Sequence, residues 1–292
     1  MRSALLASRA SNDRSAVLLT MKALIFAAGL GTRLRPLTDT MPKALVPIAG
    51  HTLLEYQIRK LRDAGINDII VNVHHFPDMI IDYLRENDNF GCNIHISDER
   101  EQLLDTGGGL LKAWNAYAAN EPLLALNVDI LSNIDLQQVL QAYNPDELGI
   151  LVVKDRQTQR YLLFDDNNYL IGWTNIATGE IKPASLSVSI RPQAGPCSIS
   201  AAVCQRSGLN PFAFSGMQIL SPQTLPLLQQ FAQVRGPKFS IIDFYLFVVE
   251  NQSGLLRALP LNVPMMDVGK IDHISEAETF AQTYTNTPAN KG

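Results

Sequence analysis

The sequence predicts an α/β fold in which a Rossmann-like, mixed but mostly parallel sheet carries helices on both faces. Short apolar runs typical of buried strands alternate with helical patterns through the first half of the chain. The first apolar run breaks into a glycine-bearing turn, as strands of such sheets do at their carboxyl ends. The length also fits, because 292 residues, 46% of them hydrophobic, suffice for one large domain.

The first strand is expected at Lys22–Ala28, an apolar run that ends in a turn over residues 28–33, called here the glycine turn. Gly29 and Gly31 leave room for a phosphate to approach backbone N–H groups. Three cations follow within a short stretch of chain: Arg33, Arg35 and Lys43. A backbone anion site beside several cations indicates a polyphosphate ligand.

A dinucleotide-binding turn is the nearest alternative, and two positions argue against it. That motif requires a small residue where this chain has Leu34. It also requires an acidic residue at the end of the second strand, about 20 residues further on. Here the second strand, at Asp68–Val73, comes later and runs into His74 and His75, which are interpreted as a turn.

The remaining elements of the first half follow in order. Thr52–Glu55 forms a capping box that opens a helix, and Gly65 ends it. Within that helix, Leu54, Ile58 and Leu61 recur at helical spacing. The second strand has its apolar part at Ile69–Val73. Further strands are expected at Asn93–Ser97, Leu123–Leu126 and Leu148–Val153, and further helices at Asp78–Glu86 and Gly107–Ala119.

The second half of the chain is less regular. A hairpin is expected around residues 165–168, between strands at Tyr161–Phe164 and Tyr169–Trp173. The other expected elements are a strand at Phe212–Leu220 and helices at Ile241–Glu250 and Ile274–Thr283. Residues 182–210 show little periodicity and are interpreted as a surface insertion. The C-terminal part lacks the hexapeptide repeat of a left-handed β-helix, so no fused acyltransferase domain of that type is expected.

Composition limits the classes of partner. A formal net charge of −4 argues against nucleic acid, and no apolar run approaches the length of a membrane span. Three cysteines (Cys92, Cys197 and Cys204) without metal-ligand spacing favour a reducing cytoplasm. Residues 1–20 are interpreted as a disordered extension that arises from an upstream start codon, with a transit-like peptide as the alternative.

Two consecutive motifs resemble the signature of the sugar-1-phosphate nucleotidyltransferases: residues 29–38, GLGTRLRPLT, and residues 42–47, PKALVP. The resemblance runs from Met21 to about residue 150 and resumes near 212–280. It implies a single domain over residues 21–292 with the nucleotide-diphospho-sugar transferase, GT-A-like fold. The step Asp105–Gly109 points towards the short N-acetylmuramate-1-phosphate uridylyltransferases and mannose-1-phosphate guanylyltransferase-like members.

The resemblance also implies a set of site residues. Arg33 and Lys43 would be the catalytic cations. The nucleotide would contact Ala28, Gly29, Gly31, Thr32, Gly107 and Gly108, and the sugar would contact Asn175 and Gly216. Asp129 and Asp267 would bind Mg²⁺.

The residues themselves leave alternatives open at several of these positions. Asp129 lies at the carboxyl end of a strand, where α/β sheets bind ligands, but could instead cap a helix near Ser132. Asp267 could be a turn aspartate before Gly269. The segment 106–109 opens a helix whose free N–H groups could bind an anion or a base edge, or could form a flexible capping loop.

The leading functional hypothesis is an Mg²⁺-dependent enzyme that makes an NDP-sugar and pyrophosphate from a nucleoside triphosphate and a sugar 1-phosphate. The transfer is in-line, so no covalent enzyme intermediate is expected. Transfer to choline phosphate or another phosphate monoester is an alternative, as is a catalytically silent nucleotide-binding regulator. The choice among UTP, GTP, dTTP and CTP, the sugar, the cation that binds the sugar phosphate and the oligomeric state stay open.

Overall fold

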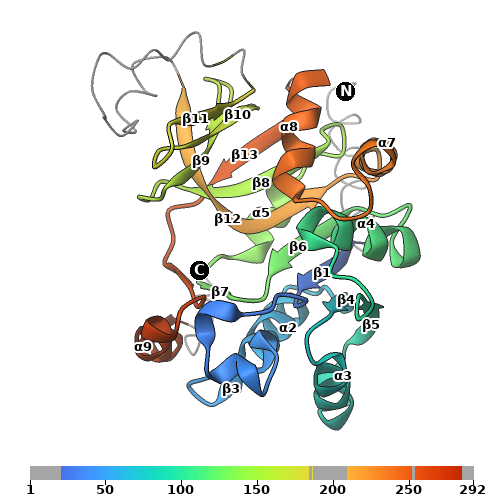
Figure 1. Ribbon diagram of the computed structural model, residues 1–292, viewed down its shortest axis with the longest axis vertical. Coiled ribbons are helices and arrows are strands. Elements are labelled where there is room, and N and C mark those ends of the chain that lie inside the picture. The colour runs from blue at the N-terminus through green and yellow to red at the C-terminus, as the bar shows by residue number, and fades with distance from the viewer. Residues whose placement is uncertain (1–20, 184–185, 187–208, 252–253, 285–292) are drawn as a thin grey trace, which may run out of the picture.

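The computed structural model describes residues 21–183, 186, 209–251 and 254–284 (Figure 1). Its strands are β1 (Lys22–Phe26), β2 (Pro47–Ile48), β3 (His51–Thr52), β4 (Asp68–Val73), β5 (Asn93–Asp98), β6 (Leu123–Asn127), β7 (Ile130–Ser132), β8 (Gly149–Lys154), β9 (Arg160–Phe164), β10 (Leu170–Asn175), β11 (Glu180–Lys182), β12 (Asn210–Leu220), β13 (Leu256–Pro260) and β14 (Met265–Asp267). Its α-helices are α2 (Leu53–Asp63), α3 (Pro77–Glu86), α4 (Asp105–Tyr117), α5 (Leu136–Ala142), α7 (Thr224–Arg235), α8 (Ile241–Asn251) and α9 (Ile274–Tyr284).

One large mixed sheet organises the described residues. Its strands run in the order β11-β10-β9-β12-β6-β1-β4-β5, with β8 paired to β12 and β13 paired to β8. The half that contains β6, β1, β4 and β5 is parallel, whereas β12 is antiparallel to β6, β8 and β9. This mixed sheet, which is parallel through β6, β1, β4 and β5 and has flanking helices, confirms the predicted fold class.

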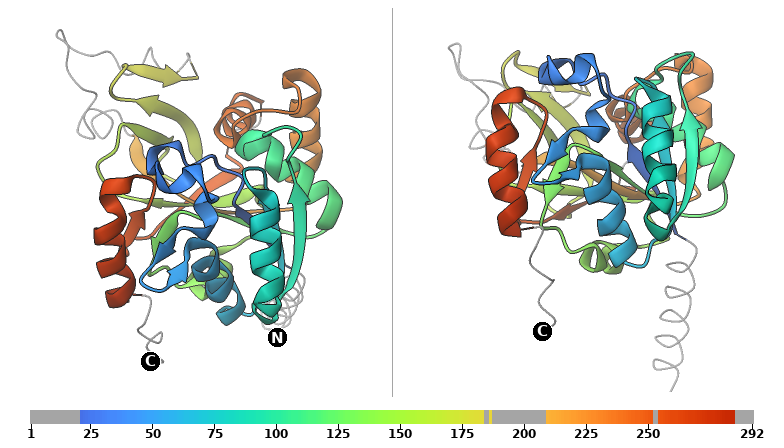
Figure 2. Two further views of the ribbon diagram at one scale, coloured as in Figure 1. Left: turned by 60° about the horizontal axis from the view of Figure 1, so that its bottom comes forward. Right: turned by 90° about the horizontal axis from the view of Figure 1, so that it is seen from below.

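The burial pattern of β1 explains why helices cover both faces. Ala23 and Ile25 belong to one apolar core, and Leu24 belongs to the other, because successive side chains of a strand point to opposite faces. Figure 2 shows α9, α2 and α3 side by side across the lower face, while Figure 1 shows α7 and α8 above the sheet. A strand buried on both faces must be apolar throughout, as the sequence indicated.

The predicted elements of the first half are confirmed with small shifts at their ends. The first strand ends at Phe26 rather than Ala28, because the N–H groups of Ala27 and Ala28 turn away to a side chain of β4. The helix expected at Gly107–Ala119 begins earlier, at Asp105, and ends at Tyr117. The hairpin between β9 and β10 is also confirmed.

Two helices and several short strands had not been predicted: α5, α7, β2, β3, β7, β11, β13 and β14. Residues 1–20 and most of the expected insertion, residues 187–208, lie outside the described residues. The division into extension, domain and insertion therefore stays a prediction. No helix among the described residues has the length and apolar character needed to cross a bilayer.

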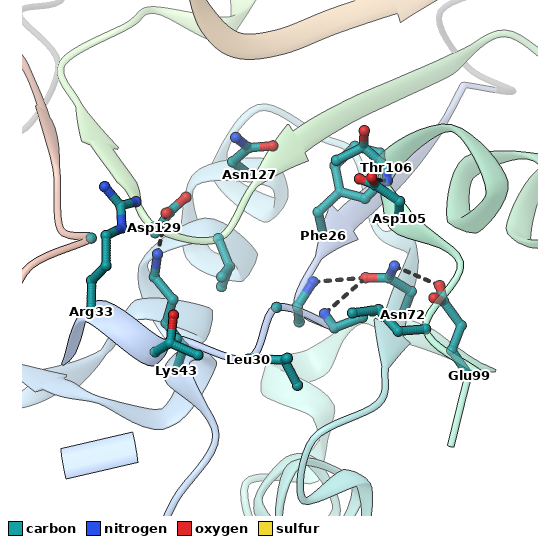
Figure 3. A pocket seen from close by; sticks show the side chains of 18 of the residues that line it. Phe26, Leu30, Arg33, Lys43, Asn72, Glu99, Asp105, Thr106, Asn127 and Asp129 are labelled. Carbon is teal, nitrogen blue, oxygen red and sulfur yellow. Dashed lines mark hydrogen bonds and ion pairs between the residues drawn. The ribbon is translucent and has the colours of Figure 1, made fainter. Parts of the chain in front are cut away.

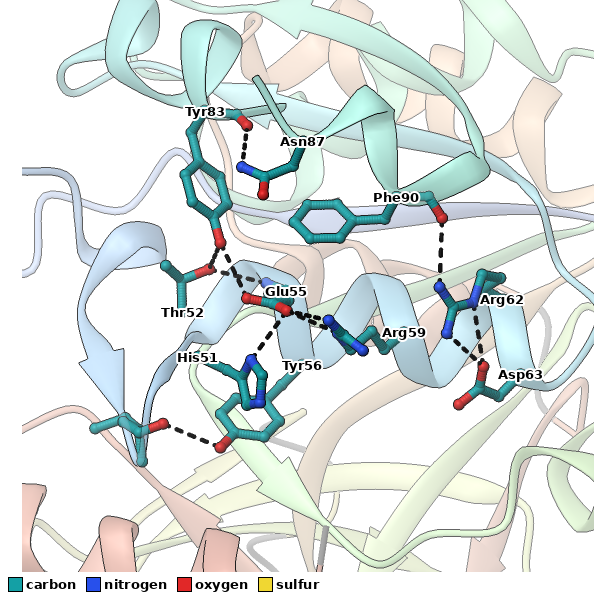
Figure 4. A network of polar contacts seen from close by, with 11 residues as sticks. His51, Thr52, Glu55, Tyr56, Arg59, Arg62, Asp63, Tyr83, Asn87 and Phe90 are labelled. Atoms are coloured by element: carbon teal, nitrogen blue, oxygen red, sulfur yellow. Dashed lines mark hydrogen bonds and ion pairs between the residues drawn. The ribbon is translucent and has the colours of Figure 1, made fainter. Parts of the chain in front are cut away.

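The predicted capping box at the start of α2 is half correct. The Thr52 hydroxyl accepts a hydrogen bond from the Glu55 N–H at 3.1 Å, as expected. The Glu55 carboxylate, however, accepts hydrogen bonds from Arg59 and Tyr83 and lies 3.0 Å from His51 (Figure 4). Burial alone would raise the pKa of Glu55, but the hydrogen bonds from Arg59 and Tyr83 lower it overall. This network ties α2 to α3 instead of closing the box.

Candidate active site

A cavity of about 510 Å³ opens at the carboxyl ends of β1, β4 and β6 (Figure 3). This is the edge at which parallel sheets place ligands, and the volume lies in the range of small-molecule sites. The residues that line it are Phe26, Ala27, Ala28, Gly29, Leu30, Gly31, Thr32, Arg33, Lys43, Asn72, Glu99, Leu103, Asp105, Thr106, Asn127, Val128, Asp129, Lys238 and Gly269. The predicted site residues of the first 130 positions therefore gather in one place, apart from Gly107 and Gly108.

The glycine turn presents free backbone donors to this cavity. In the part of the chain that the structure describes, the N–H groups of Gly29, Leu30 and Gly31 have no hydrogen-bond partner. Gly31 adopts a left-handed conformation, with φ 63° and ψ 25°. Consecutive free N–H groups around such a residue form a concave site that favours anions.

Gly29 and Gly31 lack a side chain for different structural reasons. A Cβ on Gly31 would lie 2.8 Å from Cγ2 of Thr38 and 3.0 Å from Cβ of Lys43, so the loop packs directly on it. A Cβ on Gly29 would meet nothing within 4 Å. Gly31 is therefore required for packing and backbone conformation, whereas the absent side chain of Gly29 leaves open space beside the free N–H groups.

Ala28 lines the cavity, but its N–H donates to Oδ1 of Asn72 at 3.3 Å. The N–H of Ala27 donates to the same oxygen at 2.7 Å. The donors that the turn offers to a ligand therefore begin at Gly29, one residue later than the predicted contact at Ala28.

Lys43 and Asp129 meet on one side of the cavity as an ion pair. The Lys43 ammonium donates to Oδ2 of Asp129, and both side chains are largely buried. Asp129 follows β6 and caps no helix in the described residues, since the N-cap of the next helix, α5, is Asp135. The helix-cap interpretation of Asp129 is therefore wrong.

Arg33 and Asp267 converge on the space above Gly269. A Cβ on Gly269 would lie 2.6 Å from Oδ1 of Asp267 and 2.8 Å from Nη2 of Arg33. Arg33 is exposed, lines the cavity and forms no ion pair with any described residue. Its neighbour Arg35 is also exposed but pairs with Asp39 at 3.1 Å, outside the cavity.

Strand pairing brings Asp267 towards Asp129 although 138 positions separate them. β14 runs antiparallel to β7, so that Asp267 lies opposite Ile130. The Val268 N–H donates to the backbone oxygen of Asp129 at 2.8 Å. Asp129 lines the cavity, whereas Asp267 is exposed and does not line it, but strand pairing brings its backbone next to the segment that carries Asp129.

The N-terminus of α4 differs from expectation. Gly107 and Gly108 both donate their N–H groups to the backbone oxygen of Phe239, at 2.9 and 3.3 Å, so these groups are not free for an anion. A Cβ on Gly107 would overlap the Phe239 ring, and one on Gly108 would overlap the Pro237 oxygen. These glycines allow the loop before α8 to pack on α4, and the cavity is lined instead by their neighbours Asp105 and Thr106.

The two predicted sugar contacts have different surroundings. Gly216 lies at a bulge in β12 with φ 72°, and a Cβ there would be 2.7 Å from the Asn127 amide nitrogen. Gly216 is therefore adjacent to a residue that lines the cavity. Asn175 ends β10, does not line the cavity, and accepts a hydrogen bond from the Ala177 N–H at 3.1 Å.

Besides Asp105 and Thr106, four polar residues of the cavity wall were absent from the predicted site residues: Asn72, Glu99, Asn127 and Lys238. Asn72 interrupts an otherwise apolar buried strand, and that pattern was a usable signal. Glu99 is almost wholly buried. Burial raises the pKa of its carboxyl, although hydrogen bonds from the Leu104 N–H and the Asn72 amide favour the charged form. Lys238 follows an unpredicted helix, so its location depended on the tertiary fold.

Comparison with known proteins places this geometry in context. Residues 22–162 match the family described as Nucleotidyl transferase. The N-acetylmuramate alpha-1-phosphate uridylyltransferase of Caulobacter vibrioides is 33% identical over 171 residues, which cover 55% of this chain and 70% of that protein. The mannose-1-phosphate guanyltransferase of Gibberella zeae is 37% identical over 145 residues, 48% of this chain and 40% of that protein.

Among solved structures, a putative glucose-1-phosphate thymidylyltransferase from Bacillus anthracis in complex with a sucrose superposes with a TM-score of 0.70. The alignment covers 93% of this chain and 98% of that chain, at 16% sequence identity. At this identity the likeness concerns the fold, and it extends well beyond the segment matched by sequence.

Proposed function

Because this chain belongs to the nucleotidyl transferase family, it is a nucleotidyltransferase, and we propose that its cavity joins a nucleoside triphosphate to a sugar 1-phosphate. An oxygen of the sugar phosphate attacks the α-phosphorus, the bond from that phosphorus to the bridging oxygen breaks, and pyrophosphate leaves. The products are a nucleoside diphosphate sugar and pyrophosphate, and no enzyme nucleophile takes part.

The observation that carries this proposal is the row of free N–H groups at Gly29, Leu30 and Gly31, beside Arg33 and Lys43 in one cavity. The backbone N–H groups bind the triphosphate as hydrogen-bond donors, although they carry no formal charge. Arg33 contributes a guanidinium that forms no ion pair with any described residue and can bind phosphate oxygens. Together they hold two anionic substrates close enough to react.

Lys43 differs from Arg33 because, in the free enzyme, it already forms an ion pair with Asp129. Its ammonium is held at the wall of the cavity by that contact rather than extended into solvent. We propose that Lys43 orients the Asp129 carboxylate in the free enzyme and shares its hydrogen bonds with phosphate oxygens when substrate binds. A positioned cation of this kind stabilises charge that develops on the transferred phosphoryl group.

The donor set at Asp129 and Asp267 fits Mg²⁺. No group of three or more histidine, cysteine, aspartate or glutamate side chains gathers among the described residues, which argues against a cage made by protein alone. Mg²⁺ usually takes only one or two protein carboxylates and fills its other positions with water and substrate phosphates. Bound there, the ion would neutralise charge between the two phosphates. Asp129, which follows β6, and Asp267, which ends β14, would hold it.

The relatives are named for uridylyl and guanylyl transfer, so UTP and GTP are the first nucleotides to test. A pyrophosphate-release assay would combine UTP, GTP, dTTP and CTP with a panel of sugar 1-phosphates and with choline phosphate. Turnover with one sugar 1-phosphate is expected. Turnover with choline phosphate alone, or nucleotide binding without any turnover, would contradict the proposal and favour one of the alternatives. The small number of cysteines in the sequence, three without metal-ligand spacing, supports a cytoplasmic location as part of this proposal.

A further inference from the structure

Asn72 is a buried amide on β4, and its oxygen holds the chain where it leaves β1. Oδ1 accepts hydrogen bonds from the N–H groups of Ala27 and Ala28, at 2.7 and 3.3 Å. The side chain is only 2% exposed, so no solvent replaces these bonds if they are lost. The free N–H groups of the glycine turn begin at the next residue, Gly29. The direction of the turn therefore depends on the Asn72 carbonyl.

Glu99 completes this arrangement from the other side. Its Oε1 accepts from the Asn72 amide nitrogen at 2.8 Å, and its Oε2 accepts from the Leu104 N–H at 3.0 Å. Glu99 is 1% exposed, and the positive charge of Lys112 favours the charged form of its carboxyl. Both oxygens of Glu99 thus face donors, an arrangement that suits the ionised carboxylate.

The two side chains determine each other's orientation. An amide has one acceptor and one donor end, and the carboxylate of Glu99 attracts the donor end of Asn72. If Asn72 were rotated, its NH₂ group would face the two N–H groups of Ala27 and Ala28, which cannot accept a hydrogen bond. Glu99 therefore fixes which end of Asn72 meets the glycine turn.

Helix α4 packs on this pair without any intervening side chain. A Cβ on Gly109 would lie 2.6 Å from Oε1 of Glu99 and 2.9 Å from Nδ2 of Asn72. Leu104, which Glu99 binds, directly precedes α4. The Asn72–Glu99 pair thus joins two walls of the cavity that are far apart in sequence, the glycine turn and residues 103–106 (Figure 3).

We propose that Asn72 and Glu99 are positioning residues for the nucleoside triphosphate. They act through the backbone, because the Asn72 carbonyl sets the direction of the Gly29–Gly31 N–H groups and Glu99 sets the start of α4. This inference rests on the proposed function, since it assumes that the triphosphate binds the free N–H groups. It assigns no contact with the reacting atoms to either side chain.

Single substitutions test whether the pair controls nucleotide binding. Glu99→Gln leaves one acceptor for two donors, so either Leu104 or Asn72 loses its partner. Asn72→Asp puts a second carboxylate against Glu99. Each is expected to raise KM and the Kd for the triphosphate by about tenfold to hundredfold, as misplacement of a binding group does. The Kd is measured by calorimetry without sugar phosphate, so it does not depend on turnover.

The double substitution Asn72→Asp with Glu99→Gln provides a rescue test. The amide introduced at position 99 would donate to the carboxylate introduced at position 72 and would still accept from the Leu104 N–H. That carboxylate would still accept from the N–H groups of Ala27 and Ala28. The hydrogen bond between positions 72 and 99 is thus restored with donor and acceptor exchanged, and the three bonds from backbone N–H groups keep their direction. The Kd of the double variant is expected to return to within a few-fold of wild type. A double variant as weak as the worse single variant would overturn the proposal.

Controls separate positioning from general stability. Tyr245→Phe removes a buried hydrogen bond to Gln218 that does not line the cavity, and should lower Tm without raising the nucleotide Kd. If a single variant does not fold, Gly109→Ala provides another test, because it keeps every hydrogen-bonding group but places a methyl against Glu99 and Asn72. The nucleotide Kd of Gly109→Ala is expected to rise, and an unchanged Kd would count against the proposal. Wild type that binds no triphosphate would overturn the proposed function and this inference with it. Normal binding by both wild type and Glu99→Gln would overturn only the inference.

Discussion

The ammonium group of Lys43 donates to a carboxylate oxygen of Asp129, although the two residues are 86 positions apart in sequence. Lys43 follows the loop after the glycine turn, and Asp129 follows the strand next to β1 in the sheet. The pair therefore brings a cation and a proposed metal ligand to the same wall of the cavity. Because both side chains are largely buried, each neutralises a charge that would otherwise be costly to desolvate.

Replacement of Lys43 by alanine should lower kcat/KM by about 10²-fold or more, as expected for a preorganised electrostatic group. It should also lower the free energy of unfolding by about 3 kcal/mol, because it leaves Asp129 buried without its partner. Steady-state kinetics and denaturant unfolding would measure the two effects separately. Near-normal turnover in Lys43→Ala would remove Lys43 from the catalytic residues.

Arg33 and Arg35 form a matched pair for a second test. Arg33 lines the cavity without an ion pair among the described residues, whereas Arg35 pairs with Asp39 on the surface. Arg33→Ala should lower kcat/KM by about 10²-fold. Arg35→Ala should change it by less than about threefold, because Arg35 lies outside the cavity in an exposed ion pair of the kind that contributes little. Equal losses in both variants would contradict the assignment of Arg33.

Asp129→Asn and Asp267→Asn should each nearly abolish turnover if the two carboxylates hold one essential Mg²⁺. The double variant should lose little more, since groups that act as one unit are not additive. EDTA should have the same effect on wild type, and added Mg²⁺ should restore activity. Calorimetric titration with Mg²⁺ in the presence of nucleotide provides a measure independent of turnover. Full activity in metal-free buffer would exclude the metal pair.

Gly29 and Gly31 should respond differently to alanine. Gly29→Ala should leave Tm within about 2 °C, because the added methyl meets no neighbouring atom, but should weaken triphosphate binding by filling the space beside the free N–H groups. Gly31→Ala should lower stability by about 1–3 kcal/mol, because the residue is left-handed and packs on Thr38 and Lys43. Thermal melts and calorimetry would separate the two. Unchanged nucleotide affinity in Gly29→Ala would argue against a phosphate at this turn.

Lys60 predicts an unusual dependence of stability on pH. Its ammonium donates to the backbone oxygen of Ser132 at 2.7 Å, and burial lowers its pKa to about 7, although Asp135 opposes the shift. Between pH 7 and about 10.5 the unfolded chain binds more protons at this site than the folded chain, so the destabilising effect of the buried ammonium decreases as pH rises.

The comparison of wild type with Lys60→Met isolates that contribution, because methionine does not titrate. The difference in unfolding free energy should move in favour of wild type as pH rises from about 7 to about 10, by at most about 1.4 kcal/mol per pH unit. Urea unfolding at a series of pH values would measure it. A difference that does not vary over this range would show that Lys60 keeps an ordinary pKa.

The sequence alone determined the features that depend on local patterns. The apolar run of β1 predicted a strand buried on both faces, and the observed cores on each side of Leu24 agree. The spacing of Gly29, Gly31, Arg33 and Lys43 predicted a polyphosphate site, and these four residues line one cavity. Such features follow from a few neighbouring residues, because backbone conformation and side-chain alternation are local properties.

Only the tertiary structure decided the features that depend on distant partners. The sequence predicted that the N–H groups of Gly107 and Gly108 are free to bind an anion. Instead, the backbone oxygen of Phe239, more than 130 positions later, accepts their hydrogen bonds. Asn72 and Glu99 line the cavity through contacts between strands and a helix. The physical reason is that a backbone donor or a buried polar side chain takes its role from whichever group satisfies it. Packing, rather than sequence spacing, selects that partner.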